Sequence, residues 1–339
     1  SGTSRGVLTT KETYLLEISK NNKKGIGECA IFRGLSYDDV PDYEEKLTWL
    51  CENIHSDFEV LKKELLHYPS IIFGLEQALL NLEHGEDLYF PSDFTDGKDS
   101  IKINGLIWMG NANFMQSQIE EKLAKGFDCI KLKIGVDWKS EKEIIKKLRE
   151  KFPKEQLELR VDANGAFSYE EASMVLQELA DLGIHSIEQP IKKSEVRSPK
   201  SEENSEKKST DCCIPWNKMA RLCAETPTPI ALDEELIGII DFEEKKKLLE
   251  TIKPQYIILK PALVGGFSGS DEWIAIAESL GINWWITSAL ESNIGLNAIC
   301  QYTYTKKNPL PQGLGTGALF TNNFETHLQL EGDQMWHKK

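Results

Sequence analysis

The chain has 339 residues, of which 40% are hydrophobic, and its 40 Lys+Arg against 54 Asp+Glu give a formal net charge of −14 at pH 7. This composition is typical of a globular protein with a sizeable buried core, and it excludes a disordered or fibrous chain. The negative charge repels phosphate backbones and anionic lipid, so we expect no nucleic-acid partner. No apolar run approaches the roughly 18 residues of a membrane span, so we expect no membrane partner either.

Seven cysteines are scattered along the chain without a CxxC pair. An odd number at irregular spacing argues against a disulfide framework or a structural zinc site and favours a reducing compartment. The first residues show no positively charged leader with an apolar stretch. We therefore expect a cytoplasmic protein, whose oligomeric state the sequence leaves open.

The first hundred residues predict a small α+β unit. Residues 9–18 alternate loosely, which predicts a strand, and Gly-Ile-Gly-Glu at 25–28 predicts a turn into a second strand at 29–32. Apolar residues at three- and four-residue spacing predict helices over 38–66 and 70–83. A turn-rich stretch follows, so we expect an α+β capping domain over residues 1–98.

After residue 100, short β-like segments alternate with amphipathic helical ones. The predicted strands cover 101–107, 129–134, 157–161, 184–187, 230–232, 256–259 and 282–286, with a short eighth near 310–314. The predicted helices cover 116–125, 141–150, 169–182, 242–251 and 270–280. This alternation predicts an α/β fold, a modified (β/α) barrel of the TIM type over residues 99–320. We expect the last segment, 321–339, to return to the capping domain.

Charged or polar residues follow the predicted barrel strands at a regular interval. Asp162, Glu188, Asp233 and Lys260 each stand where an apolar run stops, and the same spacing includes Lys133 and Ser288. Successive members are 26 to 29 residues apart, except for 45 residues where a polar segment, 192–210, predicts a surface insertion. Any one of them alone would be read as a helix N-cap or a solvated loop charge. Together they fall on one rim of a barrel, and the C-terminal rim carries the active sites of barrel enzymes.

Two lysines occur on one predicted strand. Lys131 and Lys133 are two residues apart, so they share a face, while Ile130 and Leu132 take the opposite face toward the helices. A Lys-x-Lys pair is weak on its own because lysines are usually solvated. On an interior strand, both would point into the barrel. A lysine crowded by other cations loses its proton more readily and can act as a base.

Three of the rim residues are carboxylates on neighbouring strands. Asp162, Glu188 and Asp233 would repel one another unless a cation lay between them. Oxygen-only ligation without His or Cys suits a hard ion, which predicts Mg²⁺, with Mn²⁺ as the alternative. Such an ion stabilises the oxyanion that forms when a carbon acid next to a carboxylate loses its proton.

Taken together, these motifs resemble the enolase superfamily, muconate-cycloisomerase type, over nearly the whole chain. They are Lys131-Leu132-Lys133, Asp162-Ala163-Asn164, Glu188-Gln189-Pro190, Asp233-Glu234, Lys260 and the segment 288–292. The segment 25–28 matches the capping domain of that superfamily. Segments 104–110 and 313–320 resemble the o-succinylbenzoate synthases of menaquinone biosynthesis.

The resemblance implies a dehydration of a cyclohexadiene carboxylate that bears a hydroxyl group and a succinyl side chain. Lys133 would remove the proton alpha to the carboxylate, giving an enediolate held by Mg²⁺, and Lys260 would supply positive charge. Lys131 would assist Lys133 and contact the carboxylate, and Asn164 and Glu234 would support the site. The candidate substrate-binding residues are thus Lys131, Asn164, Ser288 and Glu291, although the last two are equally typical of helix capping.

Two other functions stay open at the level of sequence. An N-acylamino acid racemase or dipeptide epimerase needs bases on both faces of its substrate, and Lys133 with Lys260 would provide them. Dipeptide epimerases usually carry Asp-x-Asp after the last barrel strand, and that stretch has no acid here. A barrel that only binds a carboxylate ligand is the more distant alternative, because it needs no pair of bases.

Overall fold

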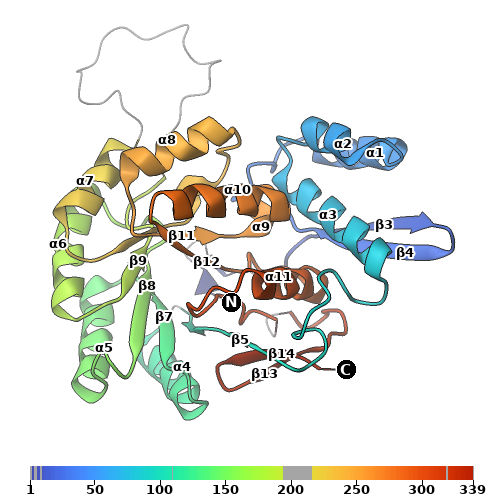
Figure 1. Ribbon diagram of the computed structural model, residues 1–339. Helices are drawn as coiled ribbons and strands as arrows, with labels where there is room; N and C mark the ends of the chain where they lie inside the picture. Colours follow the sequence, from blue (N-terminus) through green and yellow to red (C-terminus); the bar gives the residue numbers. More distant parts are fainter. Residues whose placement is uncertain are drawn as a thin grey trace, which may run out of the picture.

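The structure is a computed structural model that describes residues 2–3, 6–7, 10–108, 110–193, 216–317 and 320–338. Figure 1 shows a barrel-like sheet surrounded by helices, with a smaller α+β unit beside it. At the N-terminus, β1 (Gly2–Thr3) pairs with β2 (Gly6–Val7). Within the described ranges, no helix combines the length and the apolar character needed to cross a membrane.

In the N-terminal unit an antiparallel hairpin packs on a long helix. The elements are β3 (Tyr14–Lys20), β4 (Lys23–Cys29), α1 (Tyr43–Asn53), α2 (Phe58–Glu64) and α3 (Pro69–His84). The hairpin turns at Asn21 and Asn22, whose φ values of 51° and 62° are left-handed, a region that Asn tolerates better than most residues.

The turn predicted at residues 25–28 is wrong, because these residues lie inside β4. Their glycines serve close packing instead. A Cβ at Gly25 would lie 2.1 Å from Ala78 O, and one at Gly27 would lie 1.9 Å from Gly74 O. The two glycines let α3 approach the strand backbone, a role that the sequence pattern does not distinguish from a turn.

The single helix predicted over residues 38–66 is two helices, α1 and α2. A turn separates them, in which Ser56 N donates to Asn53 O, and Asp57 is extended with ψ 142° before α2 begins. Short polar side chains compete for backbone hydrogen bonds, which favours a break at this point. The apolar spacing continues across the break because both helices bury one face against the same core.

The larger sheet has seven parallel strands whose spatial order follows the chain. They are β6 (Gly105–Ile107), β7 (Cys129–Lys133), β8 (Glu158–Asp162), β9 (Ser186–Glu188), β10 (Ile230–Leu232), β11 (Tyr256–Leu259) and β12 (Asn283–Ile286). The short eighth strand predicted near residues 310–314 is reduced to isolated bridges. Gly313 bridges Thr287 and Gln312 bridges Ile103, so this segment joins the two edges of the sheet.

Helices follow the barrel strands. They are α4 (Ala112–Ala124), α5 (Trp138–Lys151), α6 (Tyr169–Asp181), α7 (Asn217–Glu225), α8 (Phe242–Ile252), α9 (Pro261–Val264), α10 (Gly266–Ser279) and α11 (Asn293–Thr305). The sequence did not predict α7, α9 and α11. Helix α11 buries residues on almost every side, so it lacks the polar face that makes a helix recognisable from its period.

The C-terminal hairpin joins the segment that precedes the barrel. Strands β13 (Leu328–Glu331) and β14 (Gln334–His337) pair with each other, and β14 pairs with β5 (Ile101–Lys102). His337 is fully buried, with Nε2 3.1 Å from Asp87 Oδ2 and Nδ1 3.2 Å from Thr95 O. The predicted insertion lies, apart from residues 192 and 193, outside the described residues.

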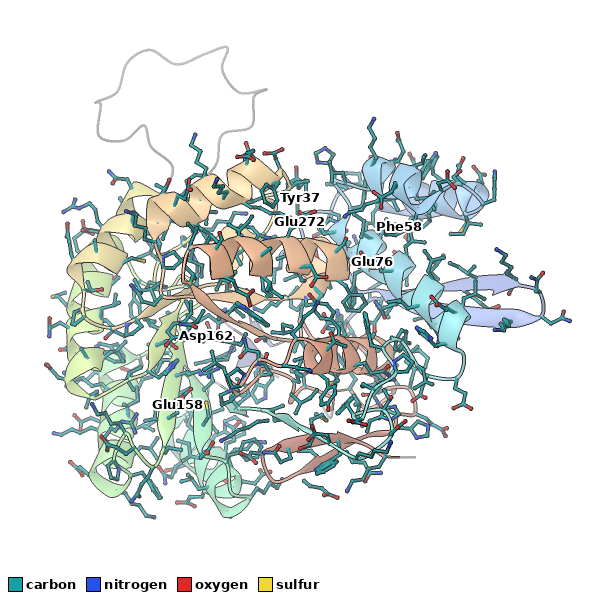
Figure 2. All side chains as sticks on the ribbon, in the orientation of Figure 1. Tyr37, Phe58, Glu76, Glu158, Asp162 and Glu272 are labelled. Carbon is teal, nitrogen blue, oxygen red and sulfur yellow. The ribbon has the colours of Figure 1, made fainter. Side chains whose placement is uncertain are left out.

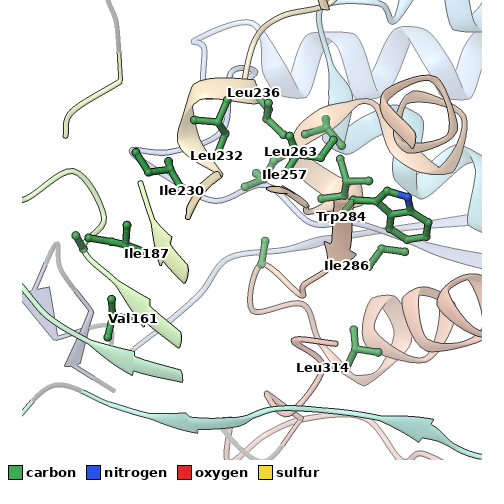
Figure 3. Close-up of a cluster of buried hydrophobic side chains, with 14 of the residues drawn as sticks. Val161, Ile187, Ile230, Leu232, Leu236, Ile257, Leu263, Trp284, Ile286 and Leu314 are labelled. Atoms are coloured by element: carbon green, nitrogen blue, oxygen red, sulfur yellow. The ribbon is translucent and has the colours of Figure 1, made fainter. Parts of the chain in front are cut away.

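The core between sheet and helices decides which side chains face the barrel interior. Figure 3 shows apolar residues from successive strands, among them Val161, Ile187, Leu232, Ile257 and Ile286, and all are buried. Burying each such side chain stabilises the fold by about 1.5–3 kcal/mol. Because side chains alternate along a strand, their sequence neighbours must point the other way, into the barrel.

Candidate active site

Adjacent strands bring the predicted rim residues into one cluster. Lys133 at the end of β7 is in register with Asp162 at the end of β8, and Asp162 is in register with Glu188 at the end of β9. Asp233 and Lys260 come directly after β10 and β11. All five lie at the C-terminal ends of parallel strands, as the spacing predicts.

Ammonium groups alternate with carboxylates in this cluster. Lys131 Nζ lies 2.7 Å from Glu188 Oε2 and 3.6 Å from Asp162 Oδ2. Lys133 Nζ lies 3.2 Å from Asp162 Oδ2. On the other side, Lys260 pairs with Asp233 and lies 3.7 Å from Glu188 Oε1. Lys133 and Lys260 thus flank the carboxylates from strands that have three others between them.

Burial and charge set the ionisation of the cluster. The side chains of Asp162, Glu188 and Asp233 are each only 2% exposed. Burial raises the pKa of Asp162, but the nearby lysines outweigh it and bring the pKa down to about 2. Burial and the neighbouring Asp162 raise the pKa of Glu188 to about 7. Burial also raises the pKa of Asp233 against the opposing charge of Lys260. The three carboxylates therefore compete for the same cations.

A second set of polar contacts fixes the loops around the cluster. Asn164, with φ 44°, accepts from Lys133 Nζ at 2.6 Å and donates to Glu234 Oε1 at 3.0 Å. Gln189, with φ 40°, accepts from Asp233 N at 3.3 Å and from Glu235 N at 3.2 Å. These side chains hold the rim in left-handed conformations that would otherwise be strained, which is typical of functional loops.

The donor set fits a hard divalent cation. Asp162, Glu188 and Asp233 offer only oxygen atoms, and Glu188 Oε1 is buried without a hydrogen bond. Within the described residues, no three acidic, His or Cys side chains are already gathered as metal ligands. The ammonium groups of Lys131 and Lys260 bridge neighbouring carboxylates, so these lysines would have to withdraw for an ion to be held.

A cavity of about 100 Å³ opens above the cluster. Lys131, Lys133, Asp162, Asn164 and Lys260 form its polar floor. Its walls include side chains that sequence reasoning did not select as functional: Phe32, Leu35, Leu106, Trp108, Thr287, Leu290 and Thr316. The cavity therefore combines a charged floor with largely apolar walls, as small-molecule sites usually do.

The two predicted substrate contacts after β12 lie in different places. Ser288 lines the cavity, and its Oγ is 2.5 Å from Thr316 Oγ1. Glu291 is not among the lining residues. Its side chain is fully buried, and its Oε2 accepts from Ala289 N at 2.7 Å.

Two lining residues come from outside the barrel. Phe32 and Leu35 follow β4 and reach the cavity from the N-terminal unit. No local sequence signal marks them, because their role depends on how that unit sits against the barrel. Trp108 and Thr316 lie in segments 104–110 and 313–320, where the family resemblance was the available signal.

The sequence matches two family descriptions in tandem. Residues 4–82 match "MenC, N-terminal domain", and residues 115–201 and 211–334 match "Enolase C-terminal domain-like". An o-succinylbenzoate synthase of Desulfotalea psychrophila is 41% identical over 98% of this chain and 94% of its own length. The chain belongs to the o-succinylbenzoate synthase (MenC) family of the enolase superfamily.

Solved structures agree with this assignment. The crystal structure of MenC from Desulfotalea psychrophila superimposes with a TM-score of 0.80 at 40% identity, covering 97% of this chain and 95% of that one. The Bacillus subtilis L-Ala-D/L-Glu epimerase matches with a TM-score of 0.76 at 19% identity over 96% of this chain and 88% of that one, which shows the shared fold alone. The predicted barrel with an N-terminal domain and the predicted superfamily are thus confirmed.

Proposed function

We propose that this chain is a lyase that dehydrates a succinyl-hydroxy-cyclohexadiene carboxylate to o-succinylbenzoate, a step of menaquinone biosynthesis. Membership of the MenC family supports the reaction class. The observation that carries the proposal is the pair of lysines, Lys133 and Lys260, on opposite sides of three buried carboxylates. A purely binding barrel has no need of this arrangement.

Lys133 is the proposed base. Its Nζ contacts two acceptor oxygens, Asp162 Oδ2 and Asn164 Oδ1, and both would hold the ammonium that forms when it takes the alpha proton. That proton and the leaving hydroxide together make the water that is lost, and the ring becomes aromatic. Lys260 carries its positive charge on the opposite side, because Asp233 and Glu188 outweigh burial and raise its pKa above the usual value.

Asp162, Glu188 and Asp233 are the proposed ligands of Mg²⁺, with Mn²⁺ as the alternative. Such an ion would stabilise the negative charge that develops on the substrate carboxylate. Lys131 and Ser288 are proposed substrate contacts, since both line the cavity. Asn164 positions Lys133 and links it to Glu234. The buried Glu291 is better assigned to loop structure than to substrate binding.

The proposed substrate is a small carboxylate, and the proposed location is the cytoplasm. Among the described residues the five cysteines, at positions 29, 51, 129, 223 and 300, are all free thiols, which suits a reducing compartment.

A second candidate is racemisation of an N-acylamino acid. Lys260 stands where a second base would be needed, and an N-succinylamino acid racemase of Thermus thermophilus is 33% identical over 52% of this chain and 40% of its own length. The two reactions differ in what they require of the lysines. A racemase needs both as bases, whereas a dehydratase needs one base and one positive charge.

Arginine substitutions separate the two reactions. We expect wild type with Mg²⁺ to consume the cyclohexadiene substrate in an absorbance assay, and EDTA to stop it. Lys133→Arg should abolish dehydration because guanidinium stays protonated, while Lys260→Arg should retain more activity than Lys260→Ala.

Exchange of the alpha proton in D₂O, measured on a panel of N-acylamino acids, tests the racemase assignment. If each Arg variant blocks exchange from one enantiomer only and no dehydration occurs, the racemase assignment replaces the synthase. Full dehydration activity after thorough chelation would remove the metal from the proposal.

A further inference from the structure

One wall of the cavity is held by side chains from the N-terminal unit. This wall loop, residues 288–292, runs from β12 to α11 and places Ser288, Ala289 and Leu290 against the cavity. Lys11 Nζ donates to Leu290 O at 2.8 Å. From the end of β4, the fully buried Glu28 reaches the N-terminus of α11.

The carboxylate of Glu28 accepts four hydrogen bonds. Oε1 accepts from Ser292 N at 3.0 Å and from Thr13 Oγ1 at 2.9 Å. Oε2 accepts from Ser292 Oγ at 2.6 Å and from Gly295 N at 2.9 Å. Bonds between a carboxylate and the free N–H groups of a helix N-terminus are charge-assisted, and the helix dipole strengthens them.

Gly295 makes room for this contact. A Cβ at position 295 would lie 2.7 Å from Glu28 Oε2, so any other residue would displace the carboxylate. The glycine on α11 and the acid on β4 are therefore complementary, although 267 positions separate them in the chain.

The wall loop is in a conformation that needs support. Leu290 has φ 63°, a left-handed conformation that is costly for a bulky side chain. Glu291 is fully buried beneath it, and its Oε1 makes no hydrogen bond. A strained loop of this kind persists when its surroundings determine its backbone. Lys11 holds the carbonyl of Leu290 in the middle of the loop, and Glu28 holds Ser292 at its C-terminal end.

We propose that Glu28 and Lys11 are positioning residues for the substrate cavity. They fix the wall loop from the N-terminal unit, so that Ser288 and Leu290 keep the place where they meet the substrate. The proposal rests on the proposed function for the identity of that substrate, while the holding of the loop is independent of it.

A second acid of the N-terminal unit provides a matched control. Glu76 on α3 is also buried, and it accepts from Phe267 N at 2.5 Å and Ser268 N at 3.2 Å at the start of α10. Figure 2 labels Glu76 beside that end of α10. Neither Phe267 nor Ser268 lines the cavity. Glu76 therefore joins the two units as Glu28 does, without touching the wall loop.

Glu28→Gln and Glu76→Gln test the proposal in the full chain. The first keeps the shape of the side chain but turns an NH₂ group toward N–H donors. We expect it to raise KM on the order of tenfold with kcat changed less than about twofold, and to speed hydrogen exchange at residues 289–295. Glu76→Gln should leave KM and the exchange of that segment unchanged.

A double variant shows whether Glu28 acts through the loop. Ser292→Ala alone should raise KM less than Glu28→Gln, and the two effects should be less than additive in the double variant, because the hydroxyl has then lost Glu28 as its acceptor and keeps only the bond that it accepts from Ile294 N. Lys11→Gln should raise KM by a smaller factor, and it serves as the test if Glu28→Gln does not fold.

The proposal is overturned if KM and loop exchange of the Glu28 variant match wild type, or if the Glu76 variant raises KM equally. Wild type that fails to dehydrate the cyclohexadiene substrate would contradict the proposed function instead. Even then, faster exchange confined to the Glu28 and Lys11 variants would support the positioning role, and unchanged exchange would reject it.

Discussion

The inward-facing charged side chains have different surroundings at the two ends of the barrel interior. Arg160 and Asp162 are two residues apart on β8 and share its inward face. Arg160, only 1% exposed, has its guanidinium 4.2 Å from the ring centre of Trp285 and donates to Pro311 O at 2.8 Å. It also pairs with Glu158 at 2.7 Å. Figure 2 labels Glu158 and Asp162 at different heights along the strand.

At the C-terminal end the charges are left facing a cavity. Lys131, Lys133 and Lys260 stand among carboxylates that share them, and no aromatic ring covers these ammonium groups within the described residues. At the N-terminal end, the ring of Trp285 and the backbone carbonyl of Pro311 cover the guanidinium of Arg160. Inward charge alone therefore does not mark a functional site. Charge that is paired and enclosed supports the fold, as with Arg160, whereas shared charge beside a cavity is available for chemistry.

The largest expected effect is at the open end. Asp162→Asn should lower kcat/KM on the order of 10³-fold or more, because several kcal/mol of charge stabilisation depend on this ligand. The fold should persist, since Lys131 keeps Glu188 and Lys133 keeps Asn164 as partners. Steady-state kinetics with Mg²⁺ and a thermal melt check both expectations. Activity within tenfold of wild type would remove Asp162 from the proposed metal site.

Arg160→Met tests the sealed end. We expect the free energy of unfolding to fall by about 3 kcal/mol, because the change leaves Glu158 and Pro311 O without their charged donor. Kinetic constants should match wild type at temperatures where the variant is folded. Arg221→Met, which removes an exposed pair with Glu225, is the control and should cost less than about 1 kcal/mol. If Arg160→Met lowered kcat as much as Asp162→Asn does, Arg160 would have a role in catalysis, and the proposed difference between the two ends would be wrong.

The smallest expected effect is a pH dependence at the sealed end. Burial lowers the pKa of His185 from 6.5, with Glu158 opposing and Arg160 adding to the shift. The folded state thus favours the neutral ring, so stability is present above pH 6.5 and is lost as pH falls below it. His185→Phe should flatten this decline between about pH 7 and pH 5 in chemical unfolding. The pH profile of kcat/KM should not change, and a shifted profile would place His185 in the chemistry.

Much of the candidate site could be predicted because two regular patterns coincide. Side chains alternate between the two faces of each strand, and the strand ends recur at a regular interval along the chain. Lys133, Asp162 and Glu188 come at the ends of apolar strands, and alternation turns them inward once Leu132, Val161 and Ile187 pack on the helices. Alternation alone does not distinguish Arg160 from Asp162, and only the position of Asp162 at the end of the strand marks it in the sequence. Both face inward, and only the closed end of the barrel, with Trp285, separates their roles.

The sequence by itself determined the alternation of strands and helices, the inward face of each barrel strand and the identity of the charged residues at the strand ends. These features follow from the two-residue alternation of side chains along a strand and from the repeat of about 27 residues between strand ends. Both patterns can be recognised without knowing which distant residues are in contact. Only the tertiary structure decided that Gly25 and Gly27 serve packing, that Phe32 and Leu35 reach the cavity, and that Glu28 caps α11. Each of these depends on how two elements that are distant in the chain pack together, and such a contact leaves no periodic pattern in the sequence of either element.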